Sequence, residues 1–221
     1  MYVWSPTATL NPTTGASVTA SPTTTTTYVV TVTDANGCND TAMVSVNVNP
    51  LPIISFTADD TAGCAPLCVT FNNTTANTQF TNWVFGDGGT TGNTNTPQHC
   101  FITSGSYSIL LMVTDNNGCT NSLTKNNFII VYPTPTAAFV AAPQPATLLN
   151  STIYFTDQST GANTWQWSFG DISNSSSSYQ NPQFTYKDTG SYGVQLIISN
   201  LFGCKDTSED IVRVIGEFAI Y

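Results

Sequence analysis

Five residues of the sequence recur almost unchanged. Trp-Val-Phe-Gly-Asp occupies residues 83–87, and Trp-Ser-Phe-Gly-Asp occupies residues 167–171. Downstream, Gly-Ser-Tyr at residues 105–107 returns at residues 190–192, and in both copies the tyrosine precedes a cysteine by 12 residues. Motifs that recur in the same order and at the same spacing indicate tandem structural repeats. The chain is therefore expected to contain two complete modules of one fold.

A shorter copy of the pattern stands at the start of the chain. Trp4 precedes Cys38 by 34 residues, against 36 and 37 residues between the corresponding tryptophan and cysteine of the complete copies. Proline-bearing stretches at residues 48–52 and 131–135 separate the copies. The expected domains are a partial module one at 1–50, module two at 51–133, module three at 134–215, and the start of a C-terminal linker or module at 216–221.

Each module alternates apolar and polar residues as β-strands do. Tyr107, Ile109, Leu111 and Val113 would share one strand face. This period of two and the Asn-Gly turns favour hairpins over helices, so the fold is expected to be all-β. About seven strands per complete module predict a two-sheet immunoglobulin-like sandwich, with the modules arranged as a rod. The strands of module two are expected at 53–59, 67–73, 81–86, 98–102, 106–115 and 119–131, with a short edge strand at most within 87–97.

The Trp-x-Phe pairs are expected to be core residues. Trp83 and Phe85 share one strand face, and so do Trp167 and Phe169. Burial of such an aromatic side chain removes about 150–250 Å² from water, an upper-bound gain of about 4–6 kcal/mol. A structural role therefore accounts for the recurrence without any chemistry. The remaining members of the expected core motif are Tyr107, Tyr192, Asp87 and Asp171.

Asp87 and Asp171 suit a tight turn after the strand. The preceding glycine permits a positive φ, and an aspartate can accept hydrogen bonds from nearby backbone N–H groups. The functional alternative is that these aspartates are catalytic or bind calcium. A general acid–base pair needs a second titratable group nearby, and the sequence around neither motif supplies one. The structural interpretation is favoured, and no catalytic residue, cofactor or metal site is expected.

Three further candidates are weighed in the same way. His99 takes a core-facing strand position, so a packed and hydrogen-bonded side chain is favoured over a ligand or base. Asp59 and Asp60 supply fewer oxygens than the roughly 6–8 that calcium needs, which favours a solvated loop. Trp165 could stack on a sugar, but it lies on the same face as Trp167 and therefore suits the edge of the core.

The charge balance excludes several kinds of partner. The net charge is -9, with only four lysines and arginines, so no nucleic acid or anionic membrane is expected to bind. No apolar run has membrane-spanning length, and the first residues lack the pattern of a signal peptide. The six cysteines lack metal-ligand spacing, which favours disulfides in an oxidising, extracellular setting.

The motifs together resemble a known family. Trp-Val-Phe-Gly-Asp-Gly, followed by Gly-Ser-Tyr-Ser and Thr-Asp-Asn-Asn-Gly-Cys, resembles the polycystic-kidney-disease-type (PKD) domain, over residues 51–215. Ile172 departs from the family's glycine, which should alter the turn alone. The Thr-rich residues 21–38 resemble modules of large surface adhesins of Bacteroidota, and residues 216–221 resemble the entry to their gliding-motility or type IX secretion module. This resemblance implies O-glycosylation at Thr41 and Thr61, which stand in Asp-Thr-Ala triplets.

One disulfide is predicted within module two. Cys68 and Cys100 lie on strands that are neighbours in this fold, and both face outward from the core. Module three has no cysteine on the matching strands. The bond would close a loop of about 33 residues and contribute on the order of 3–4 kcal/mol.

A second disulfide is predicted between modules. Cys64 lies in the loop 60–66 at the end of module two that faces module three, and the loop of Cys204 faces module two. Pairing Cys64 with Cys119 would instead span roughly 25–30 Å of strand, whereas a disulfide needs Cα atoms about 4.4–6.8 Å apart. A Cys64–Cys204 bridge is therefore expected. The disulfide partners of Cys119 and Cys38 would then lie in loops of earlier modules that this sequence does not include.

The expected function is a non-catalytic spacer or adhesion rod, extracellular and either secreted or on a bacterial surface, and a component of a surface filament. The alternative is a carbohydrate- or protein-binding accessory region of a secreted hydrolase. Expected partners are neighbouring modules of a longer chain, a second copy in head-to-tail assembly, or surface glycans and proteins. No enzymatic activity is expected.

Module one would lack the first two strands of the sandwich. Trp4 aligns with Trp83, which leaves roughly five of seven strands and an open sheet edge. One expectation is that the sequence is a piece of a longer protein that carries the missing strands. The other is strand addition from a neighbouring chain, with residues 216–221 as the donor through Phe218 and Ile220.

Overall fold

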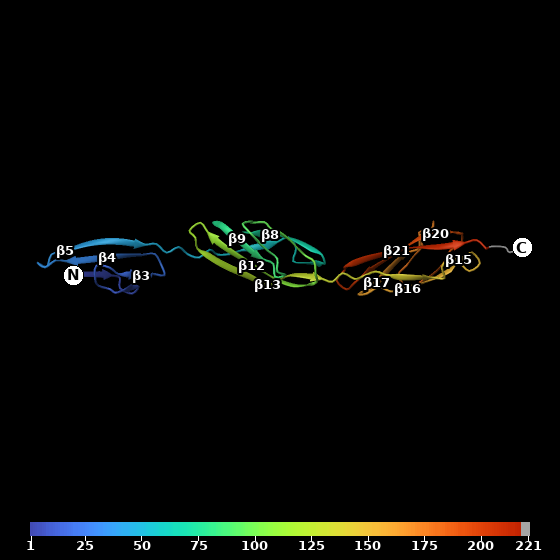
Figure 1. Cartoon of the computed structure of the whole chain (residues 1–221), viewed down its shortest axis with the longest axis horizontal. Coiled ribbons are helices and arrows are strands. Elements are labelled where there is room, and N and C mark those ends of the chain that lie inside the picture. Colours follow the sequence, from blue (N-terminus) through green and yellow to red (C-terminus); the bar gives the residue numbers. More distant parts are fainter. Residues whose placement is uncertain (218–221) are drawn as a thin grey trace.

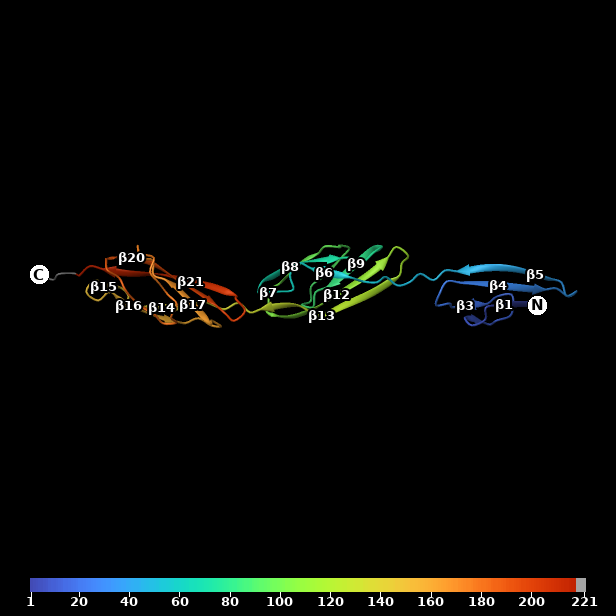
Figure 2. The ribbon, with the colours of Figure 1, turned by 180° about the vertical axis from the view of Figure 1, so that it is seen from behind.

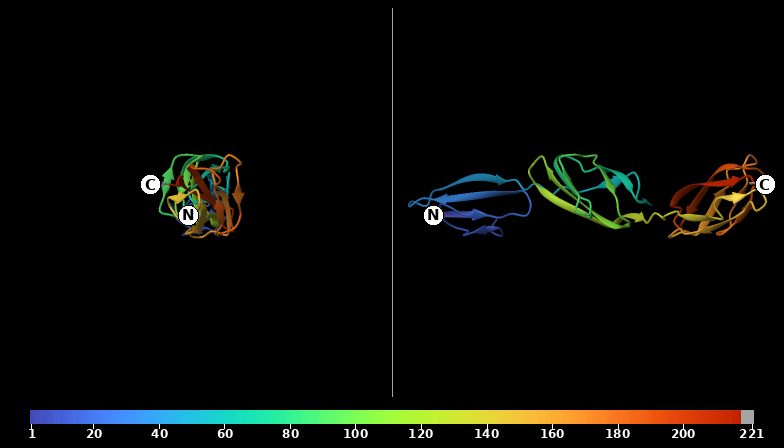
Figure 3. Two further views of the ribbon diagram at one scale, coloured as in Figure 1. Left: turned by 90° about the vertical axis from the view of Figure 1, so that its right-hand side faces the viewer. Right: turned by 45° about the vertical axis from the view of Figure 1, so that its right-hand side comes forward.

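The computed structural model describes residues 1–217 as three β modules in a row (Figure 1). The view from behind shows the same linear order (Figure 2), and the view along the long axis projects the modules onto one another (Figure 3). The molecule is therefore an extended rod, as its repeats predicted. Over residues 1–217, no helix is long and apolar enough to cross a membrane.

Module two is a complete two-sheet sandwich. One sheet has the strand order β10-β9-β12-β13-β7, and the other has the order β11-β8-β6. β12 is central because it pairs antiparallel with both β9 and β13. The strands are β6 (Phe56–Ala58), β7 (Ala62–Cys64), β8 (Leu67–Asn73), β9 (Thr78–Val84), β10 (Thr90–Gly92), β11 (Gln98–Phe101), β12 (Gly105–Asp115) and β13 (Thr120–Tyr132).

Module three repeats this architecture. Its sheets have the orders β15-β21-β20-β17-β18 and β14-β16-β19, which match those of module two strand for strand. The all-β, immunoglobulin-like fold class expected from the sequence is thus confirmed. The strands are β14 (Phe139–Ala142), β15 (Ala146–Thr147), β16 (Thr152–Asp157), β17 (Thr164–Ser168), β18 (Ser176–Ser177), β19 (Gln183–Thr185), β20 (Gly190–Ser199) and β21 (Lys205–Ile215).

Module one is one three-stranded sheet with a small hairpin beside it. The sheet has the order β1-β4-β5, and the hairpin pairs β2 with β3. Trp4 on β1 pairs with Val30 on β4, as Trp83 on β9 pairs with Leu111 on β12. The module therefore contains one sheet of the sandwich. The strands are β1 (Tyr2–Ser5), β2 (Leu10–Asn11), β3 (Thr19–Ala20), β4 (Thr26–Thr33) and β5 (Asn39–Val46).

The prediction of a continuous loop at residues 60–66 is wrong in part. Residues 62–64 form β7, which crosses from the sheet of β6 and β8 to the other sheet and runs parallel to β13 there. Three residues are too few to show a period of two, so the sequence pattern gave no sign of this strand. The correction matters for Cys64, which ends β7 opposite Tyr132 and is held by the sheet rather than by a loop.

The two complete modules have equivalent aromatic cores. Trp83 is fully buried and packs edge-on against Phe56, with ring centroids 5.3 Å apart. Trp167 packs edge-on against Phe139 in the same way, at 5.1 Å. Other buried core residues occupy equivalent positions in the two modules. In the same order, they include Phe71, Phe85, Leu111 and Val113 in module two and Phe155, Phe169, Leu196 and Ile198 in module three.

The tryptophan of each module also makes the same hydrogen bond. The indole N–H groups of Trp83 and Trp167 donate to backbone carbonyls 11 and 12 residues downstream, at 3.0 and 2.9 Å. Trp4 does likewise 11 residues downstream, at 3.0 Å. A buried indole N–H needs a partner, and in modules two and three this bond holds the segment that follows β10 or β18 against the strand that carries the tryptophan. Trp4 thus makes the same kind of hydrogen bond as the tryptophans of the complete modules.

Gly86 cannot be replaced without strain. Its φ is +82°, and a Cβ atom would lie 2.6 Å from the carbonyl oxygen of Ser108. Gly86→Ala is therefore expected to lower the free energy of unfolding of module two by about 2–3 kcal/mol, measured by denaturant unfolding. Gly118→Ala is the matched control, because Gly118 has a φ of +81° and no atom near the added Cβ. Equal effects at both positions would show that the contact with Ser108 costs nothing.

Candidate functional site

Asp87 forms a pair with His99 at the turn after β9. The Asp87 carboxylate lies 2.7 Å from Nε2 of His99 and accepts the N–H of Gly89 at 2.9 Å. The imidazole stacks on Phe85, with ring centroids 4.2 Å apart and planes 6° from parallel. His99 is thus packed and hydrogen-bonded, as its strand position predicted. The expectation that Asp87 has no titratable neighbour is wrong, because β11 carries His99 across from the other sheet.

The Asp87–His99 pair, called here the Asp87 clip, connects the turn after β9 to β11 in the opposite sheet. Partial burial raises the pKa of Asp87, but the hydrogen bonds from His99 and Gly89 outweigh it and hold this pKa below its ordinary value of 3.8. Nucleophilic catalysis would need a hydroxyl or thiol within hydrogen-bond reach of the imidazole. Among the described hydrogen bonds of residues 1–217, His99 has Asp87 as its sole side-chain partner.

Module three closes the corresponding turn, which is two residues longer, without a histidine. Phe184 takes the place of His99 and stacks on Phe169 at 4.4 Å and 7°. Asp171 instead accepts the backbone N–H and the hydroxyl of Ser175, at 2.7 and 2.8 Å. Ile172 is fully exposed and therefore lies outside the core. In both modules the aspartate of the motif accepts a backbone N–H of the turn, whether a histidine or a phenylalanine stacks on the phenylalanine of the motif.

The Asp87 clip predicts a dependence on pH. Asp87→Asn is expected to destabilise module two at about pH 7, and this effect should disappear as the pH falls through the folded pKa of Asp87, which lies below 3.8. A carboxyl group whose pKa is lowered in the folded state stabilises the fold above its unfolded pKa, and this contribution is lost as the pH falls through the folded pKa. Denaturant midpoints measured across this range test the prediction.

His99→Phe is the control for that experiment. It copies Phe184 of module three, so it keeps the ring stack while removing the partner of Asp87. This variant should flatten the pH dependence less than Asp87→Asn does, because the hydrogen bond from Gly89 to Asp87 remains. A native pH dependence in both variants would contradict a stabilising role of the pair.

The other sequence candidates have structural roles. Trp165 is half-buried against the core of module three, and its indole N–H donates to Asp157 at 2.8 Å, as a residue at the core edge would. Asp59 and Asp60 are exposed, as residues of a solvated loop would be. Asp59 also accepts hydrogen bonds from the backbone N–H groups of Asp60 and Thr70, and the second of these connects the loop to β8. Over residues 1–217, no three histidine, cysteine, aspartate or glutamate side chains gather as a metal site would require.

Thr41 and Thr61 are both exposed. Thr41 lies on β5, and Thr61 precedes β7. Modification of either residue stays a prediction.

The disulfide inside module two joins directly opposed residues. Cys68 on β8 pairs with Cys100 on β11, and the structure links them with a Cα–Cα distance of 3.9 Å. Both residues face away from the core, as the alternation along these strands predicted. The bond ties the second sheet together on its outer side.

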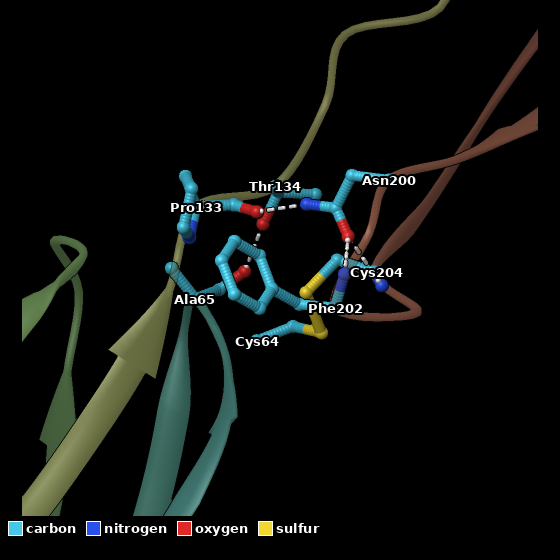
Figure 4. The surroundings of a disulfide bond; sticks show 7 residues. All are labelled: Cys64, Ala65, Pro133, Thr134, Asn200, Phe202 and Cys204. Carbon is cyan, nitrogen blue, oxygen red and sulfur yellow. Dashed lines mark hydrogen bonds between the residues drawn. A yellow bond between two sulfur atoms is a disulfide. The ribbon is translucent and has the colours of Figure 1, made fainter. Parts of the chain in front are cut away.

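A second disulfide joins module two to module three. Cys64 and Cys204 are bonded, with their Cα atoms 5.6 Å apart (Figure 4). Beside the bridge, the ring of Tyr132 stacks on Phe202 at 4.4 Å and 8°. The structure therefore contains the predicted inter-module bond, together with an aromatic contact that the sequence did not indicate.

Hydrogen bonds complete this joint. The side-chain amide of Asn200 donates to the carbonyl of Pro133 at 2.7 Å, and the hydroxyl of Thr134 donates to Ala65 at 2.5 Å (Figure 4). Asn200 also accepts the N–H of Cys204, so one side chain positions both the linker and the disulfide. A covalent bond, a ring stack and directed hydrogen bonds thus act together on a short linker.

The joint between modules one and two has neither the disulfide nor the ring stack of the joint between modules two and three. Cys119 occupies the position of Cys204 but is a free thiol, and its sulfur lies 3.9 Å from the carbonyl oxygen of Asn49. Asn121 donates to Pro52 at 2.9 Å. Cys38, at the corresponding turn of module one, is also free and exposed. The donor segment expected at 216–221 cannot be assessed, because Phe218 and Ile220 lie outside the described residues.

Comparisons with known proteins agree with this architecture. The PKD domain family model matches residues 49–131 and again 130–214. Among solved structures, the PKD1 domain of Vibrio cholerae metalloprotease PrtV is 24% identical, covering 37% of this chain and 96% of that chain at a TM-score of 0.32. The PKD1 domain of Vibrio anguillarum Epp is 20% identical, covering 38% and 96% at a TM-score of 0.33.

Longer structures are also similar. The fibronectin(III)-like modules of Clostridium thermocellum CbhA are 13% identical, covering 74% of this chain and 94% of that chain at a TM-score of 0.35. Only non-catalytic PKD domains are detected in the chain, and together with its disulfides they indicate an extracellular protein. Because the two matches span residues 49–214 of 221, the chain belongs to the PKD domain family.

Proposed function

We propose that this chain is a non-catalytic spacer rod of an extracellular bacterial protein, which holds neighbouring modules at a distance from a surface. The observation that carries the proposal is the joint of modules two and three, where the Cys64–Cys204 bond and the Tyr132–Phe202 stack fix one module to the next. Inter-domain contacts without such bonds allow relative motion by default.

Several finer features of the proposal go beyond the joint itself. The rod belongs to a surface adhesin or filament, of the kind that Bacteroidota export through type IX secretion. Its neighbours are further modules, a second copy in head-to-tail contact, or surface proteins and glycans. The net charge of -9 favours repulsion from other acidic surfaces.

Small-angle X-ray scattering of the oxidised chain tests the proposal. A spacer should give the long, multi-peaked distance distribution of modules in a row, unchanged over a range of salt concentrations. The same measurement after selective labelling of Cys38 and Cys119 gives an internal distance along the rod. A compact particle, or one that collapses at high salt, would contradict a spacer role.

One observation favours the alternative of a carbohydrate-binding accessory region. Module three has an open hollow of about 650 Å³ whose lining includes Gln166, Tyr179 and Lys205. An aromatic ring beside amide and ammonium groups can bind a polar, ring-shaped ligand. In affinity electrophoresis through polysaccharide gels, retardation that Tyr179→Ala removes and Tyr154→Ala leaves would support this role, since both tyrosines are exposed.

A further inference from the structure

The two disulfides of the chain lie in different surroundings. Cys68 and Cys100 are both exposed, on the outer side of the sheet β11-β8-β6. In the inter-module bridge, Cys204 is 1% exposed and Cys64 is half-buried beside the ring stack of the joint. Because a thiolate must reach a sulfur atom to exchange with a disulfide, the Cys68–Cys100 bond is the more accessible of the two.

Cys100 lies at the edge of its sheet. Within residues 1–217, β11 pairs with β8 alone, and Cys100 stands directly opposite Cys68 in that pair. Gln98 and Thr70 form the neighbouring pair on the same face, and both side chains are uncharged. This pair therefore presents no charge of its own to repel an anionic thiolate that approaches the bond.

Module three has no disulfide at the corresponding position. Thr152 on β16 stands opposite Thr185 on β19, and their hydroxyl groups are hydrogen-bonded at 2.8 Å. The sheet β14-β16-β19 nevertheless has the same strand order as β6-β8-β11. A covalent bond between these two strands is therefore not a requirement of the fold.

Other contacts hold β11 in module two. Phe101 is completely buried in the core. His99 is bound to Asp87 at 2.7 Å and stacks on Phe85 at 4.2 Å. Opening of the disulfide should therefore leave β11 in place, and module two should remain folded with two free thiols.

We propose that the Cys68–Cys100 bond is a thiol-exchange site, at which a low-molecular-mass thiol opens module two to a dithiol form while the inter-module bridge stays closed. Exposed disulfides are in general more readily reduced than the structural disulfides of secreted proteins. The site lies on the outer side of a complete module, and its chemistry is separate from the spacer role of the rod.

The exchange proceeds in two steps. The thiolate of one external thiol attacks a sulfur of the disulfide, a new S–S bond forms to that cysteine, and the other cysteine leaves as a thiolate. A second external thiolate attacks the new bond and releases the first cysteine. Two external thiols are thereby oxidised to one disulfide as the Cys68–Cys100 bond is reduced, and their two protons pass through the solvent to the two cysteines.

The rates at which a thiol opens the two disulfides test the proposal. Full-length Cys38→Ser/Cys119→Ser removes the free thiols and leaves the bonded cysteines. The native protein is treated with dithiothreitol, new thiols are trapped with N-ethylmaleimide at successive times, and peptide mass spectrometry follows each bond separately. Cys68–Cys100 should open about tenfold faster than the inter-module bridge. Equal rates, or faster opening of the bridge, would overturn the proposal.

Urea separates attack on the folded module from attack on unfolded chains. Below the unfolding transition, the rate of attack on the folded module should change by less than about twofold. Opening that requires unfolding would instead accelerate exponentially with urea, because the unfolded fraction does so. Such an acceleration at Cys68–Cys100, or loss of the β-sheet circular dichroism signal once this bond is open, would contradict an exchange site on the folded protein.

Two matched variants test the direction of approach. Gln98 on β11 and Gln183 on β19 occupy equivalent exposed positions in the two modules. At low salt, Gln98→Glu should slow the opening of Cys68–Cys100 by anionic 2-mercaptoethanesulfonate about threefold relative to neutral 2-mercaptoethanol. Gln183→Glu should leave this ratio unchanged. If Gln98→Glu leaves it unchanged as well, the thiol does not approach over the outer face, and the proposal is overturned.

Discussion

Trp83→Ala is expected to destabilise module two by about 3–5 kcal/mol, the cost of removing a large aromatic side chain from a core. Trp83 is fully buried and contacts Phe56 and Phe71. Its loss also removes the indole N–H that donates to the carbonyl of Thr94, at the start of the segment leading to β11. For a module of this size such a loss is a large share of the total stability.

The modular architecture supplies the controls for this variant. Hydrogen exchange should show loss of protection in β9, β12 and β13, while β17, β20 and β21 keep theirs. Trp4→Ala in module one should have a much smaller effect, because Trp4 is partly exposed and has no second sheet above it. Loss of protection in both complete modules would show that their cores are coupled through the joint. An effect of Trp4→Ala equal to that of Trp83→Ala would contradict the description of module one as an uncovered sheet.

The strands and core were predictable because a half-buried strand imposes a period of two on its sequence. Tyr107, Ile109, Leu111 and Val113 alternate along β12, and all four are buried. The partner of Asp87 was not predictable in this way. His99 lies 12 residues away on the opposite sheet, and contact between them depends on how the sheets pack. The available signal was its alignment with Phe184, which places its ring over Phe85.

The inter-module disulfide was predictable for a different reason. Strand number and length determine which loops lie at which end of a sandwich, and this excluded Cys119 as the partner of Cys64 without any knowledge of side-chain packing. The ring stack beside the bond was not predictable, because Tyr132 and Phe202 approach each other only once the joint is built. The first joint has asparagines, Asn49 and Asn117, where the second has these two rings.

Because the disulfide and the ring stack occur together at the second joint, removing the Cys64–Cys204 bond tests what each of them contributes to the orientation of the modules. The double variant Cys64→Ser/Cys204→Ser is expected to release module three from its fixed orientation relative to module two. The bridge connects residues 140 positions apart, so in the chain-entropy model it contributes about 5 kcal/mol to the unfolding of both modules together. Without it the modules should melt in separate transitions, and scattering should report a broader distance distribution with a shorter mean length.

The matched control is Cys68→Ser/Cys100→Ser, which removes a disulfide from module two and leaves the joint intact. With a sequence separation of 32, this bond should contribute about 3–4 kcal/mol to module two alone, with no change in the scattering profile of the folded rod. The two double variants thus separate loss of stability from loss of orientation. If Cys64→Ser/Cys204→Ser retains the native distance distribution, the Tyr132–Phe202 stack and the Asn200 hydrogen bond suffice to hold the joint, and the disulfide is not what makes the rod stiff.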